Sequence, residues 1–250
     1  MRFASSFIVA IIALICLNST ASGQSRSRLE LAEEISTKQV EIAQLEKQFL
    51  EPSEDDRQQY AEFLLKPNTG LIRLMPRELF DSEAYKKNKK IISIRGGGAY
   101  YSFPRLTHEY GYGSDISLDS GYLSVGFAGA DYGMLVNIGD TDLEGLSIDS
   151  PYAAALARYQ AVGTEPEARI EQRRVSIGTN VEGLTVKNRL PLEVKATYLV
   201  RSISFGCSDV LVGFKVLRKD SDGSVIIAWK LLHSYVTPKL ARTSDAVGSH

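Results

Sequence analysis

A histidine beside a carboxylate is the clearest source of acid–base chemistry in this sequence. His108 is followed directly by Glu109, and Asp115 comes seven positions after the histidine. A carboxylate can orient an imidazole as a general base, so these three residues are the candidate catalytic group of a secreted hydrolase. A histidine hydrogen-bonded at a sheet surface is the commoner alternative. The Gly-x-Ser-x-Gly motif of many serine hydrolases is absent, so the nucleophile is not identified.

An acidic loop at residues 139 to 150 is the candidate metal site. Asp140, Asp142 and Glu144 alternate along it, and a glycine occupies the sixth position, as in calcium loops of the helix-loop-helix type. The twelfth position, which supplies a bidentate carboxylate in such loops, is Pro151 here. An acidic turn without a metal is therefore favoured, and no cofactor is expected. No pair of histidines or cysteines has the spacing of zinc ligands.

Glycine and tyrosine are concentrated between residues 91 and 139, which hold ten of the twenty glycines. Glycine suits turns and bulges, and tyrosine suits a half-buried pleated surface, so this stretch predicts a meandering antiparallel sheet. Tyr110 and Tyr112 would share one face of a strand and form a ledge that binds a protein or glycan. Alternatively, most of the tyrosines fill the core with their hydroxyls at its rim. The tyrosines concerned are Tyr100, Tyr101, Tyr110, Tyr112, Tyr122 and Tyr132.

The C-terminal part of the chain contains the clearest strand patterns, at residues 196–204, 210–218 and 224–235. An Asp-Ser-Asp-Gly turn joins the last two, and Trp229 is expected to anchor the core. Strands punctuated by glycine, without strand–helix alternation, indicate an α+β fold. We expect an N-terminal helical hairpin, then a mainly antiparallel β domain with one inserted helix near residues 151–162.

The N-terminal region predicts a helix at residues 25–51 with an apolar seam about three heptads long. Ser53 begins a capping box for a second helix that ends near residue 66. The seam could pack on that helix or on a second copy of the chain. Lys38 interrupts it, and burying a lysine in a dimer is costly, so we expect a monomer or weak oligomer. The seam consists of Leu31, Ile35, Ile42, Leu45 and Phe49, and the facing residues are Tyr60, Phe63 and Leu64.

The first residues have the features of a secretory signal peptide. Arg2 precedes an apolar run of 11 residues, and Ala21-Ser22-Gly23 fits the small-x-small cleavage rule. This run is short for a bilayer, so no transmembrane helix is expected after cleavage, and the protein is expected to be secreted or periplasmic. The predicted segments are a signal peptide at 1–23, a helical hairpin or short coiled coil at 24–66, the β domain at 70–238 and a disordered tail at 239–250.

The composition excludes some partners. The 250 residues are 44% hydrophobic, and 29 basic against 30 acidic residues give a formal net charge of −1. Such a balance creates no field that attracts nucleic acid, so no nucleic-acid partner is expected. Cleavage would leave Cys207 as the only cysteine, which excludes an intrachain disulfide. The sequence therefore favours an exported, non-enzymatic binding or structural module for an unknown protein or glycan, with the hydrolase as the alternative.

Overall fold

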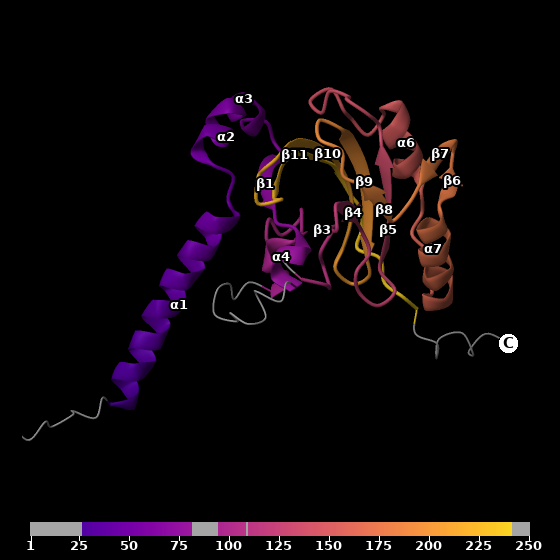
Figure 1. The fold of residues 1–250 in the computed structure, drawn as a ribbon. Helices are drawn as coiled ribbons and strands as arrows, with labels where there is room; N and C mark the ends of the chain where they lie inside the picture. The colour runs from indigo at the N-terminus through magenta and orange to yellow at the C-terminus, as the bar shows by residue number, and fades with distance from the viewer. Residues whose placement is uncertain (1–26, 82–94, 109, 242–250) are drawn as a thin grey trace, which may run out of the picture. The chain divides into compact units, whose positions relative to one another are not determined.

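The computed structural model describes residues 27–81, 95–108 and 110–241 (Figure 1). These residues form two compact units, one that ends at Leu45 and one that begins at Glu46. The predicted signal peptide and most of the predicted tail lie outside the described ranges. The architecture confirms the α+β prediction, with helices at the N-terminal end followed by antiparallel sheets.

Helix α1 (Arg28–Leu50) is the predicted N-terminal helix. It begins with a capping box that the sequence analysis did not identify. The Ser27 hydroxyl accepts a hydrogen bond from the Glu30 N–H at 3.1 Å, and the Glu30 carboxylate accepts one from the Ser27 N–H at 2.8 Å. The five seam side chains are between 42% and 64% exposed.

The capping box at Ser53 forms as predicted and begins α2 (Glu54–Gln59). The Ser53 hydroxyl accepts from the Asp56 N–H at 3.2 Å, and the Asp56 carboxylate accepts from the Ser53 N–H at 3.1 Å. The helix is interrupted at Tyr60 and resumes as α3 (Ala61–Leu64). Phe63 is buried in a core cluster against the main sheet, and Tyr60 and Leu64 pack on the same cluster. Both helices therefore belong to the second unit.

The main sheet has five antiparallel strands in the order β1-β11-β10-β9-β5. They are β1 (Thr69–Leu74), β5 (Tyr132–Asn137), β9 (Thr197–Ser204), β10 (Ser208–Lys219) and β11 (Val225–Ser234). The last three confirm the C-terminal strand predictions. Gly70 of β1 lies opposite Trp229, which is buried as predicted, and a Cβ at Gly70 would approach the indole ring to 2.6 Å. Only glycine fits here, because the indole covers the strand.

A second antiparallel sheet has four short strands in the order β2-β3-β4-β8. They are β2 (Tyr100–Tyr101), β3 (Ile116–Asp119), β4 (Tyr122–Ser124) and β8 (Arg189–Pro191). The first three lie in the stretch rich in glycine and tyrosine and form an antiparallel meander as predicted, whereas β5 of the same stretch belongs to the main sheet. A separate hairpin joins β6 (Thr179–Val181) to β7 (Leu184–Val186), and two short helices, α4 (Arg77–Asp81) and η1 (Arg95–Gly98), connect β1 to β2 in the described chain.

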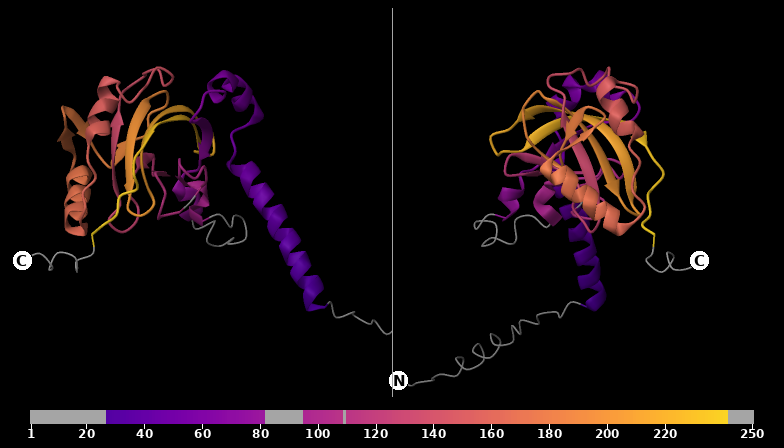
Figure 2. Two further views of the ribbon diagram at one scale, coloured as in Figure 1. Left: turned by 180° about the vertical axis from the view of Figure 1, so that it is seen from behind. Right: turned by 90° about the vertical axis from the view of Figure 1, so that its right-hand side faces the viewer.

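The main sheet has a core on each face. One core lies between the two sheets and includes Phe103, Phe214 and Trp229. The other lies under α6 (Pro151–Arg158) and α7 (Glu165–Ile177), and the right-hand view of Figure 2 shows α7 lying across the strands. The predicted insert at 151–162 ends at Arg158, and α7 is a second inserted helix. These layers leave β1 at one edge of the main sheet.

Candidate binding site

The structure does not bring His108 and Asp115 of the candidate catalytic group into hydrogen-bonding contact. The His108 Nε2–H donates to the Arg73 carbonyl at 2.7 Å, and its ring lies edge-on to Tyr101 with centroids 5.1 Å apart. Asp115 is fully buried, and its Oδ2 accepts from the Phe103 N–H at 2.8 Å. No hydrogen bond joins His108 to Asp115 among the described residues, and Glu109 lies outside them.

Burial also shifts the pKa values of the two residues in opposite directions. Burial lowers the pKa of His108, with a smaller opposing effect from its bond to the Arg73 carbonyl, so the imidazole is neutral at pH 7. Burial raises the pKa of Asp115 to about 6, although the Ser202 hydroxyl and the Phe103 N–H oppose this shift. Because Asp115 makes no hydrogen bond to His108 among the described residues, it does not orient this imidazole as a base. His108 instead bonds to the Arg73 carbonyl and so blocks one hydrogen-bonding position on the edge of β1.

Tyr110 and Tyr112 lie in a loop and not on a strand, so strand alternation does not place them on one face. Both are about half exposed, at 53% and 52%. Tyr110 packs edge-on against Tyr100, with centroids 4.9 Å apart, whereas the Tyr112 hydroxyl donates to the Phe205 carbonyl at 2.9 Å. The two rings thus anchor the loop at different places. Three of the other tyrosines considered for the surface are buried: Tyr100, Tyr101 and Tyr132.

Lysines pair with two of the three candidate carboxylates of the acidic loop. The Lys215 ammonium donates to the Asp140 carboxylate at 2.5 Å and lowers the pKa of that group. Asp142 accepts hydrogen bonds from the N–H groups of Glu144 and Gly145, both at 3.1 Å, and the Glu144 carboxylate pairs with Lys66. Within the described ranges, no group of three or more histidine, cysteine, aspartate or glutamate side chains could hold a metal ion.

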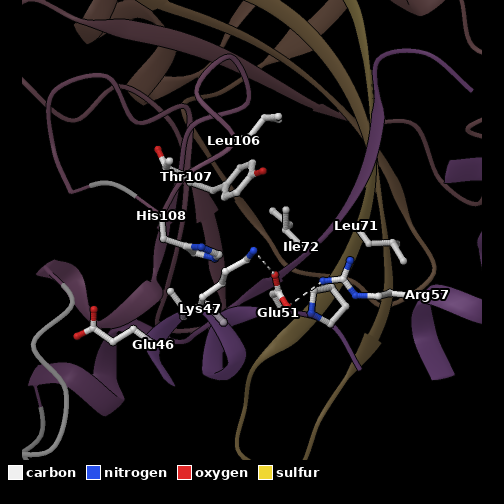
Figure 3. A pocket seen from close by; sticks show the side chains of 12 residues that line it. Glu46, Lys47, Glu51, Arg57, Leu71, Ile72, Leu106, Thr107 and His108 are labelled. Carbon is white, nitrogen blue, oxygen red and sulfur yellow. Dashed lines mark ion pairs between the residues drawn. The ribbon is translucent and has the colours of Figure 1, made fainter. Parts of the chain in front are cut away.

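An open pocket of about 430 Å³ lies beside the edge of β1 in the second unit (Figure 3). Apolar side chains contribute much of its lining, and charged groups lie at its mouth. The apolar and aromatic lining residues are Leu50, Pro52, Leu71, Ile72, Tyr101 and Leu106. The last turn of α1, the loop into α2, β1, β2 and the loop that ends at His108 position these residues.

The outer side of β1 carries main-chain groups that do not face β11. The Leu231 N–H donates to the Asn68 carbonyl at 2.8 Å. Along an antiparallel strand, the main-chain groups of successive residues point alternately toward and away from the neighbouring strand. The bond at Asn68 therefore shows which residues of β1 point their N–H and C=O groups away from β11. Thr69, Leu71 and Arg73 therefore direct their N–H and C=O groups away from β11.

Contacts within the chain close part of this edge and leave part open. The His108 Nε2–H donates a hydrogen bond to the Arg73 carbonyl, and the Met75 N–H donates to the Gly98 carbonyl at 3.1 Å. At Leu71, which lines the pocket, no described residue bonds the outward N–H or C=O. The opposite edge of the sheet is bridged at Leu135, which exchanges two main-chain hydrogen bonds with Lys187 at 2.7 and 3.1 Å. The open part of β1 thus adjoins a pocket.

Three charged side chains meet at the mouth of the pocket. Glu51 lies between Lys47 and Arg57, at 3.6 Å from the ammonium and 3.2 Å from the guanidinium (Figure 3). Glu46 also lines the pocket, but Figure 3 shows its carboxylate pointing away from this group. Sequence analysis identified none of these residues as functional. The Lys47–Glu51 pair is an i,i+4 contact at the end of α1, which the sequence alone could indicate, whereas its place beside the pocket depends on the tertiary structure.

Comparisons with protein-family models, with curated proteins and with solved structures found no match to this chain. No helix in the described part of the chain is long and apolar enough to cross a membrane.

Proposed function

We propose that this protein is an exported, non-enzymatic binding module whose ligand is an extended segment of another protein. The segment adds to the edge of β1 and places side chains in the pocket. One observation carries this proposal. The N–H and C=O of Leu71 point away from β11, no described residue bonds them, and they adjoin a pocket of about 430 Å³. Export is inferred from the signal-peptide pattern at residues 1–23.

The chemistry of the site favours a peptide over a glycan. A β-strand ligand offers an N–H and a C=O at the spacing that Leu71 requires, and its alternate side chains point to opposite faces. The apolar lining, which includes Leu50, Pro52 and Ile72, suits such side chains better than the hydroxyls of a sugar. The bond from His108 to Arg73 limits pairing to the part of β1 before Arg73.

Two observations support a role without catalysis. The Nε2 proton of His108 is held by a backbone carbonyl, and Asp115 is fully buried. A general base needs an accessible nitrogen within reach of a substrate and a group that orients it. The described residues provide no second group for His108.

A proline at Leu71 tests strand addition. The Leu71 N–H points away from β11, so Leu71→Pro removes an outward donor and keeps the hydrogen bonds between β1 and β11. We expect this variant to bind peptides selected from a random library about tenfold more weakly, because one hydrogen bond is lost. Leu71→Ala is the matched control, since it shortens the same side chain but retains the N–H. Isothermal titration calorimetry of the full chain would measure both.

Peptides with single N-methyl groups give a test that does not depend on folding of the variants. N-methylation at the residue that pairs with β1 should abolish binding, whereas methylation at its neighbours should be tolerated. Equal binding of the Leu71→Pro variant and of every N-methylated peptide would contradict strand addition. Failure of a diverse library to yield any ligand would also contradict the proposal.

A further inference from the structure

We infer that the extended ligand presents a carboxylate, which binds between Lys47 and Arg57 in the place that Glu51 now occupies. This inference rests on the proposed function, because it concerns the same pocket. It adds the chemical class of the ligand and assigns Glu51 as an internal competitor for the ligand group.

Two positively charged side chains and one negatively charged side chain meet at the mouth of the pocket. One carboxylate is shared by two cations, with Glu51 Oε1 at 3.6 Å from Lys47 Nζ and Oε2 at 3.2 Å from Arg57 Nη2. This group of three side chains carries a net positive charge, because it has two cations and one anion, and the carboxylate of Glu46, which also lines the pocket, points away from it (Figure 3). A negatively charged ligand group is therefore attracted to the mouth.

Arg57 has hydrogen-bond donors that Glu51 leaves unused. A guanidinium has five N–H donors and binds a carboxylate best through two parallel hydrogen bonds. Arg57 contacts Glu51 through Nη2, and the guanidinium has no other partner in the described part of the chain. A ligand carboxylate approaching from the pocket can make the paired contact that Glu51 does not make.

Displacing Glu51 from the two cations costs little free energy. The side chains of Lys47, Glu51 and Arg57 are 76%, 37% and 42% exposed. Ion pairs with this exposure add little to stability, because water screens the charges and the side chains lose entropy when they pair. Glu51 can return to solvent when the ligand enters, so the exchange leaves the fold intact.

The test compares acidic ligands with their neutral equivalents. For a peptide selected on the full chain, Arg57→Gln should weaken binding about tenfold, since a charge-assisted hydrogen bond is lost. Glu51→Gln should strengthen the same binding severalfold, because the competing charge is removed. Glu165→Gln on α7 is the matched control. It removes a carboxylate that pairs with Arg169 through an exposed i,i+4 contact and should leave affinity unchanged.

Variation of the peptide identifies the source of the carboxylate. Loss of binding on amidation of the C terminus indicates the terminal carboxylate, and loss on changing Asp or Glu to its amide indicates a side chain. If neither change matters, or if Glu51→Gln and Arg57→Gln both bind as the wild type does, the carboxylate inference is overturned. In that case a continued effect of Leu71→Pro would leave the peptide-binding proposal standing. If no peptide binds, both proposals are overturned.

Discussion

Replacing Asp209 with alanine is expected to destabilise the folded protein by about 3–5 kcal/mol, because Arg201 would remain charged and buried without its carboxylate. The side chains of Arg201 and Asp209 are only 1% and 4% exposed. Arg201 Nε and Nη2 donate to the two oxygens of Asp209 at 2.5 and 2.9 Å. For a chain of this size, the loss lowers the Tm by roughly 6–20 °C.

The arginine has further partners, which explains why the effect should spread beyond β9 and β10. Its Nη1 donates to the Leu156 carbonyl of α6 at 3.1 Å, and its guanidinium lies 3.2 Å from the centre of the Tyr235 ring. The pair thus holds α6 and the segment after β11 to the sheet. Loss of Asp209 should loosen both, which hydrogen exchange would detect as faster exchange in α6.

Chemical denaturation of paired variants would measure this effect. Glu182→Ala removes the carboxylate of an exposed pair with Arg158, whose side chains are 45% and 63% exposed, and should leave the Tm unchanged. The double change Arg201→Met with Asp209→Leu should recover much of the stability lost in Asp209→Ala, because it removes both buried charges. An Asp209→Ala protein as stable as the wild type would show that Arg201 finds another partner or water.

Replacing Asp115 with asparagine is expected to stabilise the protein at neutral pH and to have much less effect in acid. The pKa of Asp115 is raised from 3.8 to about 6 in the fold, mainly because burial disfavours the charged form. The folded state therefore holds this proton more tightly than the unfolded state. The contribution of Asp115 to stability falls as pH rises from about 4 to about 6, and above that range the ionised carboxylate costs about 3 kcal/mol.

Asparagine fits the same position without the charge. Its carbonyl oxygen can accept from the Phe103 N–H, as Asp115 Oδ2 does at 2.8 Å. Asp115 Oδ1 and the Ser102 hydroxyl are both buried, and neither has a hydrogen-bond partner among the described residues, although Ser102 lies close enough to the carboxyl to lower its pKa. An amide N–H₂ in place of Oδ1 gives Ser102 a donor to accept from. The substitution should therefore keep the contacts that Asp115 makes and add one.

The free energy of unfolding, measured by urea titration across this pH range, would test the prediction. The gain of Asp115→Asn over wild type should grow with pH and reach a plateau above about pH 6. Asp140→Asn is a control of opposite sign, since Lys215 lowers the pKa of Asp140 and favours its charged form. Parallel pH profiles for wild type and Asp115→Asn would show that burial does not raise the pKa of Asp115.

Features specified by neighbouring residues could be predicted from the sequence. The capping box at Ser53, the turn between β10 and β11, and the three C-terminal strands all form as predicted. Each depends on side chains within a few positions of one another, such as Ser53 and Asp56. The burial of Trp229 was also predicted, because its strand is apolar on both faces. The α+β class follows from the sum of these local patterns.

Contacts between distant residues were decided by the tertiary structure alone. The choice of which tyrosines are buried, the pairing of Arg201 with Asp209 and the burial of Asp115 depend on how the two sheets and the helices stack. Thr164 and Glu167 form a capping box that is visible in the sequence, yet the helix it begins, α7, was not predicted as a separate insert.

The candidate binding site shows the same limit most clearly. Leu71 lies in a short apolar segment that is typical of a strand, but its position at the edge of the sheet results from pairing with β11, far along the chain. That pairing faces Leu71 outward and brings the end of α1 and the loop before His108 around it. Local propensity and periodicity determine whether a segment is a strand. Which side of it stays open depends on the other segments that pack there.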